Sequence, residues 1–561
     1  MKLSTIALSS SVALLMLGTA ACNKKQQPFL SDYFSTDPTP LVTVGQNVPA
    51  QINGRIPEKV MVKNAKVTAT PVLVWADGQT AAEPFVFQGV DVKDNGWTIP
   101  ESGGSMAIPF LVAYQPAMQS SDLYLDFTVD QKGKSYTLPR VKVGYGVIAT
   151  STLANAATVH PAIAPDNFQK VITEKYSADI HFLINQANIR ASQTDQASYI
   201  DLNRQLIEAN ADPNKEIAGI TINSYASPEG TLAFNTQLAQ KREINTTNLV
   251  ENQLRADKIK EFDKLTSSFT PEDWEGFKQL VEKSNIQDKD LILTVLAMYP
   301  DPEQREREIR NLSSVFNELA DQILPQLRYS RIQASINVLG KSDEELINLY
   351  NTDPSKLTVD EILYVATLTD DNTKKMEIYR KAADLYPSDF RTHNNLGVTQ
   401  YQAGNYNDAA KDFDRASTLN PASKETKMNQ GLIYMLNGNW TQANESLGSA
   451  AGLEEDKDAL GVYYLSRGDL AAATTAFADS KSNNAAVAQI LAKDYTAARN
   501  TLANIKTPDA TTYYLRAILG ARTDNSNMVL SNLKEAVKLD PSLLTRARKD
   551  LEFKNYNLSS L

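Results

Sequence analysis

Apolar residues change their spacing along the chain, and the first clear pattern is an alternation. Between residues 39 and 150, apolar and β-branched residues alternate with polar ones in runs such as KVMVKNAKVTATPVLVWA and LYLDFTVD. Turn-rich pieces such as ADGQT and DQKGK separate these runs. A period of two indicates strands, and turns at this spacing favour two packed antiparallel sheets. We therefore predict an antiparallel β-sandwich over 39–150.

Strand-like and helix-like segments alternate in the next region, 171–341, which follows a linker at 151–170 rich in Ala, Thr and Pro. YSADIHFLI, IAGITINSYA and LRYSRIQASINVL have the apolar content of strands, and segments of helical spacing lie between them. This order predicts an α/β domain. Capping residues in front of Pro271 and Pro302 predict an insertion of two or three helices over about 256–322.

Small and large residues recur in register in the last region, 342–561. Gly397 and Gly431 lie 34 residues apart, and Pro387 and Pro421 show the same offset. Alanines and aromatic residues recur at matching positions around each glycine. This period is typical of stacked helix pairs, in which small residues let the two helices of a pair approach. We predict a C-terminal α-helical solenoid.

The N-terminal segment has the features of an export signal. Lys2 precedes an uncharged apolar run, and small residues precede Cys22. The run is too short for a spanning helix, so we expect residues 1–21 to be a cleaved signal peptide. Cys22 is the only cysteine, and cleavage in front of it would leave it first in the mature chain. The alternative is an ordinary signal peptide with an incidental cysteine. We expect residues 22–38 to be a flexible tether.

Composition narrows the chemistry of the chain. One cysteine and three histidines leave no cysteine-based zinc site, no intramolecular disulfide and few candidates for acid–base catalysis. A net charge of −10 without a block of Lys and Arg argues against nucleic acid as a partner. The sequence has no nucleophile elbow, phosphate loop or HExxH motif. We therefore expect a protein without enzymatic activity, metal or cofactor.

Some acidic and histidine residues still need an interpretation. We interpret Asp91, Asp94 and Glu101 as turn residues of the β region, with a calcium site as the alternative. His181 stands on a predicted strand, and we interpret it as a packed residue rather than a ligand.

The N-terminal segment resembles a bacterial lipoprotein signal, with Thr19-Ala20-Ala21-Cys22 as its lipobox. Thr19 stands where that family usually has Leu. The resemblance implies acylation of Cys22, palmitate included, which would anchor the protein in a membrane. The β region resembles the N-terminal domains of Bacteroidota envelope lipoproteins. Surface-exported lipoproteins of that phylum carry acidic residues after the cysteine, and none follows here, so we expect an outer-membrane anchor that faces the periplasm.

The string SYASPEGTLAFNTQLAQKRE resembles the OmpA-like domain, a peptidoglycan-binding module. The resemblance implies that Arg242 binds the carboxylate of diaminopimelate, with Asn235 beside it, and that an acid on the preceding turn takes the ammonium. Ser227 stands where the family has that Asp, and Glu229 is the acid that could replace it. The alternative keeps the fold and uses Arg242 as an ion-pair residue on the helix surface.

The helical repeats resemble tetratricopeptide repeats, which bind peptides or proteins in a concave groove. On that model the first helices of two units line the groove with Asn394, Val398, Tyr401, Met428, Leu432 and Met435. The alternative is a groove used only for packing within the protein.

Together these resemblances predict a Bacteroidota envelope lipoprotein that combines an OmpA-like domain with tetratricopeptide repeats. We expect a scaffold that contacts the membrane through its lipid, peptidoglycan through its α/β domain, and envelope proteins through its repeats. The alternative is an accessory subunit of an outer-membrane assembly, secretion or fimbrial machine that does not bind peptidoglycan.

Overall fold

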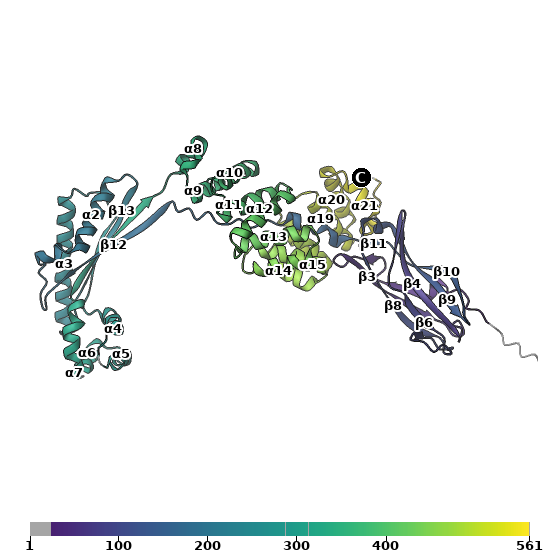
Figure 1. Ribbon diagram of the computed structural model, residues 1–561, viewed down its shortest axis with the longest axis horizontal. Coiled ribbons are helices and arrows are strands. Elements are labelled where there is room, and N and C mark those ends of the chain that lie inside the picture. The colour runs from purple at the N-terminus through teal and green to yellow at the C-terminus, as the bar shows by residue number, and fades with distance from the viewer. Residues whose placement is uncertain (1–23, 287, 312, 560) are drawn as a thin grey trace, which may run out of the picture. The chain divides into compact units, whose positions relative to one another are not determined.

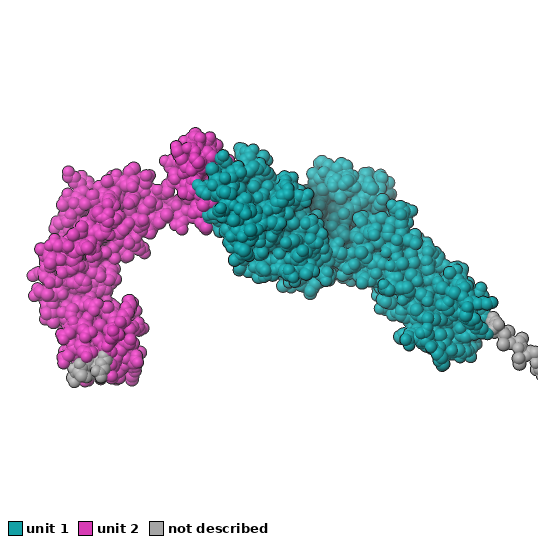
Figure 2. Space-filling model, viewed as in Figure 1, with its two compact units in different colours: residues 1–165, 370–561 teal, residues 166–369 magenta. Residues whose placement is uncertain are grey.

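The computed structural model describes most of the chain: residues 24–286, 288–311, 313–559 and 561. The signal peptide and Cys22 therefore lie outside the described residues. The chain divides into two compact units, which Figure 2 shows in different colours. The first combines Met1–Pro165 with Asp370–Leu561, and the second is Asp166–Thr369. None of the helices in the described part of the chain has the length and apolar content needed to span a membrane.

The N-terminal part of the first unit is a pair of β-sheets around one core (Figure 1). The smaller sheet has the order β1-β3-β8: β1 (Phe34–Asp37), β3 (Asn47–Ile56) and β8 (Gly104–Ala113). The larger has the order β10-β9-β4-β6-β7, with β5 paired to β4: β4 (Ala65–Trp75), β5 (Gly78–Ala81), β6 (Phe85–Gln88), β7 (Trp97–Thr98), β9 (Ser121–Gln131) and β10 (Lys134–Tyr145). Phe110 of β8 and Phe127 of β9 enter the shared core from opposite sheets. The prediction of a β-rich N-terminal region is confirmed.

Residues 24–38 are packed, so the prediction of a flexible tether over 22–38 is wrong for them. Phe29 is buried, and its ring centroid lies 4.9 Å from that of Phe127. β1 pairs along its length with β3. The buried Gln26 accepts a hydrogen bond from the Val62 N–H at 2.9 Å. A mostly polar segment is ordered here because two phenylalanines, Phe29 and Phe34, are buried in the core.

The C-terminal part of the first unit consists of stacked antiparallel helix pairs, as predicted. The helices are α10 (Asn372–Leu385), α11 (Phe390–Gln402), α12 (Tyr406–Leu419), α13 (Lys424–Leu436), α14 (Trp440–Ser449), α15 (Asp456–Arg467), α16 (Leu470–Ala476), α17 (Asn483–Leu491), α18 (Tyr495–Ala503), α19 (Ala510–Arg522), α20 (Ser526–Leu539) and α21 (Leu543–Lys549). A Cβ at Gly461 would lie 2.4 Å from the ring of Phe477, which explains why glycine recurs where paired helices cross.

Several contacts join the β region to the repeats. β2 (Leu41–Val42) pairs with β11 (Val147–Ile148) inside the β region, and the turn η3 (Thr150–Leu153) that follows β11 contacts α17. The hydroxyl of Thr150 donates to Glu552 at 2.5 Å, and the Lys554 ammonium donates to the Tyr145 hydroxyl at 2.9 Å. The β region and the repeats therefore form one compact unit.

The second unit is built on a four-stranded sheet of order β12-β15-β13-β14, in which only β13 and β14 are parallel. The strands are β12 (Val171–His181), β13 (Lys215–Tyr225), β14 (Leu265–Thr270) and β15 (Tyr329–Leu339). Helices α2 (Ala197–Ala211) and α3 (Leu232–Ala256) cover one face, and the buried isoleucines of the strands pack beneath them. The short helix α1 (Ala191–Thr194) precedes α2. This is the predicted alternation of strands and helices.

The predicted insertion over 256–322 differs from the structure at its start. β14 lies within it and extends the sheet beside β13. Its residues are exposed or half-buried, so an edge strand of this kind leaves no apolar alternation to detect. The rest is helical and has a core of its own, with α4 (Trp274–Lys283), α5 (Lys289–Met298), α6 (Pro302–Asn311) and α7 (Ser313–Gln322).

The boundary between the α/β domain and the repeats, predicted at residue 342, lies later in the structure. Helices α8 (Asp343–Thr352) and α9 (Val359–Val365) belong to the second unit, and the repeat region starts at residue 370. Lys341 and Lys170 hold these helices to that unit through Glu361 at 2.6 Å and Asp343 at 2.8 Å.

Candidate functional site

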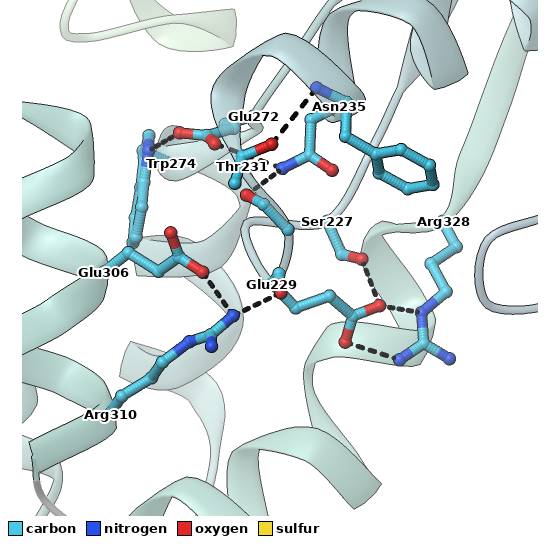
Figure 3. A network of polar contacts seen from close by, with 11 residues as sticks. Ser227, Glu229, Thr231, Asn235, Glu272, Trp274, Glu306, Arg310 and Arg328 are labelled. Carbon is cyan, nitrogen blue, oxygen red and sulfur yellow. Dashed lines mark hydrogen bonds and ion pairs between the residues drawn. The ribbon is translucent and has the colours of Figure 1, made fainter.

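The turn between β13 and α3 carries the residues predicted for peptidoglycan, and Figure 3 shows its polar contacts. The Ser227 hydroxyl donates to the Glu229 carboxylate at 2.9 Å. The buried Asn235 amide donates to the Gly230 carbonyl at 2.9 Å and to Glu272 at 3.1 Å. Three of the four predicted residues are therefore brought together at the start of α3, but each polar group already has a partner within the protein.

Glu229 is neutralised by Arg328. The guanidinium forms a bidentate pair with the carboxylate, at 3.0 Å from Nε and 2.9 Å from Nη2 (Figure 3). The two side chains are only 12% and 16% exposed. Arg310 donates to the Glu229 carbonyl and pairs with Glu306 at 2.5 Å. A ligand ammonium would have to compete with a bidentate arginine for this carboxylate.

Arg242 is fully buried, so the alternative that it is an ion-pair residue on the helix surface is wrong. Its three guanidinium nitrogens donate to main-chain carbonyls: Nε to Gln186 at 3.0 Å, Nη1 to Tyr225 at 2.8 Å and Nη2 to Leu183 at 3.3 Å. The ring of Phe182 lies 4.9 Å from the guanidinium. Burial lowers the pKa of Arg242 to about 10, and the charge of Arg328 adds to this. Arg242 therefore joins the loop after β12 to the end of β13, and its contact with a ligand stays a prediction.

The groove of the repeats contains a segment of the same chain. All six groove residues named above are buried. Five of them share one core with Ala156, Val159 and Ala162, which belong to the predicted linker. We call residues 155–165 the strap. It contains a single turn, η4 (Ala156–Thr158).

Asparagines of the first helices bind the strap through its main chain. The Asn429 amide accepts from the Ala162 N–H at 2.7 Å and donates to the Ala162 carbonyl at 2.8 Å. Asn395 makes the same pair of bonds with Ala164, at 2.8 and 2.9 Å. Each amide thus satisfies both polar groups of one strap residue, so these buried groups are not left unpaired.

Two further residues extend this pattern along the groove. Asn484 of α17 accepts from the Asn155 N–H at 2.9 Å and donates to its carbonyl at 3.1 Å. The Tyr401 hydroxyl donates to the Ala156 carbonyl at 2.7 Å. The Asn394 amide also donates to the Ala162 carbonyl, at 3.1 Å. Of the residues that bind the main chain of the strap, only Tyr401 and Asn394 had been predicted in the groove. Asn395 and Asn429 each stand two residues before the repeat glycine, and this register is the signal that could have identified them.

Replacement of Asn429 by alanine tests this mode of binding. We expect the strap to open more easily by about 2 kcal/mol, since the buried Ala162 N–H would lose its acceptor and the Ala162 carbonyl would keep only the Asn394 amide as a donor. Hydrogen exchange of the Ala162 amide should accelerate accordingly. Asn500→Ala, an exposed site on α18, is the matched control. Unchanged exchange at Ala162 in Asn429→Ala would contradict this account.

Asp456 is an unusual residue in the repeat core. It stands five residues before Gly461, where the two preceding units have buried threonines, Thr392 and Thr426. Asp456 is 3% exposed, and its Oδ1 has no hydrogen-bond partner among the described residues. Burial raises its pKa from 3.8 to about 6. The carboxylate form is therefore disfavoured in the folded protein.

Replacement of Asp456 by asparagine should stabilise the repeats in a pH-dependent way. Because the folded pKa is the higher one, the folded state retains a proton that the unfolded state loses, and the resulting stability declines as pH rises through about 6. We expect Asp456→Asn to raise the free energy of unfolding by about 3 kcal/mol at pH 8 and by about half of that at pH 5. Thermal denaturation at both pH values measures this, with Glu454→Gln as the control. A gain that is equal at both pH values would refute the assignment.

The remaining candidates are engaged in ordinary contacts. Asp94 pairs with Lys66 at 2.5 Å and Glu101 with Lys63 at 2.9 Å. His181 is half-buried, and burial lowers its pKa. Within the described ranges, no three or more His, Cys, Asp and Glu residues gather in a way that could hold a metal ion.

Comparison with known proteins supports the prediction of tetratricopeptide repeats. Residues 390–423 match the family model of the tetratricopeptide repeat. A tetratricopeptide repeat protein from Parabacteroides merdae is similar at 13% identity over 38% of this chain and 91% of its own, with a TM-score of 0.30. The Pseudomonas aeruginosa protein pilF is similar at 16% identity over 35% of this chain and 96% of its own, with a TM-score of 0.29. A search of curated protein sequences gave no match.

These comparisons identify the repeats. The structural neighbours are tetratricopeptide-repeat proteins. The OmpA-like assignment of the α/β region and the lipoprotein assignment of the N-terminus stay predictions. Repeats of this kind typically form protein-interaction scaffolds rather than enzymes.

Proposed function

We propose that this protein is a non-enzymatic scaffold, held at the outer membrane by lipid on Cys22, whose repeats recruit protein partners in the periplasm. The observation that carries the proposal is the array of helix pairs, which contains a groove able to bind an extended segment. Asp94, Glu101 and Glu229 are each paired with a Lys or Arg, which favours binding over catalysis.

Between the two scaffold roles, the contacts of the β13–α3 turn favour the accessory subunit of an outer-membrane machine. The wall-binding role needs a free guanidinium and a free carboxylate. Arg242 donates to three carbonyls, and Glu229 is paired with Arg328. We therefore propose that the α/β region serves as a protein interface and does not bind peptidoglycan.

Two measurements on the full chain test this proposal. The purified protein should not co-sediment with peptidoglycan sacculi, and saturable co-sedimentation would restore the wall-binding role. Crosslinking in intact envelopes, followed by mapping of the crosslinked peptides, should place a partner protein on residues 370–561. Crosslinks no more frequent than background on these residues would reject partner recruitment.

A further inference from the structure

We propose that the strap is a built-in substitute for a partner segment. On this view the groove binds an extended, alanine-rich segment of another protein, with a Lys or Arg where the strap has His160. The inference rests on the proposed function, because it names the class of partner that the repeats recruit.

The first argument is that the groove binds the strap through hydrogen bonds to its main chain. Asn395, Asn429 and Asn484 each bind both the N–H and the carbonyl of one strap residue, and Tyr401 binds a further carbonyl. Main-chain recognition gives affinity for any extended segment that fits, and side-chain pockets then select among sequences.

The second argument concerns the size of the buried side chains. The strap residues that enter the core are small, namely Ala156, Val159 and Ala162. Ala164 is also fully buried. A large or charged side chain at these positions would clash or lose its hydration. The groove therefore selects segments with small residues at this spacing.

The third argument comes from an acid-lined cavity beside the strap. The cavity has a volume of about 500 Å³, and Thr158 and His160 form part of its wall. Four acids and two lysines line the opposite side: Glu454, Glu455, Asp458, Asp479, Lys457 and Lys481. The strap contains no Lys or Arg. A partner with a cation at this position would gain attraction that the strap lacks.

A partner segment can replace the strap in the groove while the β region stays attached to the repeats. Thr150 and Tyr145 hold that region to the C-terminal segment through Glu552 and Lys554, outside the strap. A tethered segment competes at a high effective concentration, so an incoming segment needs additional affinity to displace it. The cation opposite the acid-lined cavity supplies that affinity, and the strap thereby excludes neutral competitors.

A peptide-binding experiment on the full chain tests the inference. The probes are two fluorescent synthetic peptides covering residues 154–166, one unchanged and one with His160→Arg. The proteins are the wild type and Ala162→Glu, whose buried carboxylate would dislodge the strap. By fluorescence anisotropy at low salt, we expect Ala162→Glu to bind the His160→Arg peptide at least tenfold more tightly than the wild type does. We also expect it to bind that peptide several-fold more tightly than the unchanged one.

Further measurements make the result decisive. Asn429→Ala added to Ala162→Glu should weaken peptide binding at least tenfold. Should Ala162→Glu fail to fold, the wild type provides the readout, because the His160→Arg peptide in excess should accelerate hydrogen exchange of the Ala162 and Ala164 amides. Failure of the folded variant to bind either peptide, or exchange in the wild type that the peptide leaves unchanged, would overturn the inference. Equal affinity for the two peptides would overturn its cationic part.

The outcome is separable from that of the proposed function. Crosslinks to residues 370–561 without peptide binding would reject the strap inference and keep partner recruitment. Peptide binding without any crosslinked partner would keep the groove specificity and reject recruitment in the envelope.

Discussion

Replacement of Arg242 by alanine is expected to lower the free energy of unfolding of residues 166–369 by about 3–5 kcal/mol. The substitution removes the side chain that donates to the carbonyls of Leu183, Gln186 and Tyr225. It also creates a cavity where the guanidinium packs on Phe182. Urea denaturation of the full chain, followed by a probe in this unit, measures the effect.

Two controls separate the role of the buried guanidinium from that of helix charge. Lys241→Ala removes an exposed cation one residue earlier on α3 and should change stability by less than about 0.5 kcal/mol. Arg242→Lys keeps the charge but lacks the fork that reaches three carbonyls, so it should be nearly as destabilising as alanine. A loss below about 1 kcal/mol in Arg242→Ala would show that the three hydrogen bonds do not hold the loop.

This prediction changes how wall binding has to be tested. A loss of sacculus binding in Arg242→Ala would report unfolding of the α/β region rather than loss of a ligand contact. Wild-type co-sedimentation is the cleaner measurement, because it does not perturb a buried charge. Glu229 has the same difficulty, since its removal would leave Arg328 buried and unpaired.

The helical repeats could be predicted because their packing imposes residue types at fixed positions. Gly461 has to be small where Phe477 crosses it, and Gly397 meets Phe413 in the same way. The sequence therefore carries the period directly. The β region was predicted for a similar reason, since one buried face forces alternation along each strand, as in β8.

The strap could not be predicted, because its contacts leave little trace in its own sequence. Its hydrogen bonds come from the main chain, which every residue has, and its buried side chains are mostly alanines that also suit a linker. The signal lies instead in the repeats, where Asn395 and Asn429 occupy the same register. For the motif around Arg242, the position could be predicted from the sequence but the contacts could not. Spacing located the residue on its helix, but it could not reveal that the loop after β12 supplies two carbonyls to the guanidinium and the end of β13 a third.

Replacement of Cys22 by serine is expected to release the protein from the membrane completely. Cys22 is the only cysteine, and serine provides no thiol for acylation. Each methylene of an acyl chain contributes about 0.8 kcal/mol to membrane binding, so on the proposed lipid anchor the loss of two or more chains removes far more affinity than any surface contact replaces. Detergent phase partitioning and membrane flotation measure the release, and metabolic labelling with palmitate detects the lipid itself.

The matched control for this substitution is Asn23→Ser, which changes the adjacent residue and keeps the thiol. It should remain in the detergent phase and incorporate palmitate, as the wild type does. The Cys22→Ser protein should move to the aqueous phase while its repeats retain their melting temperature, because Cys22 precedes the residues that pack in the β core. Retention of the serine variant on membranes without label would mean that protein contacts hold it there, and the scaffold would then depend on its partners rather than on lipid for its location.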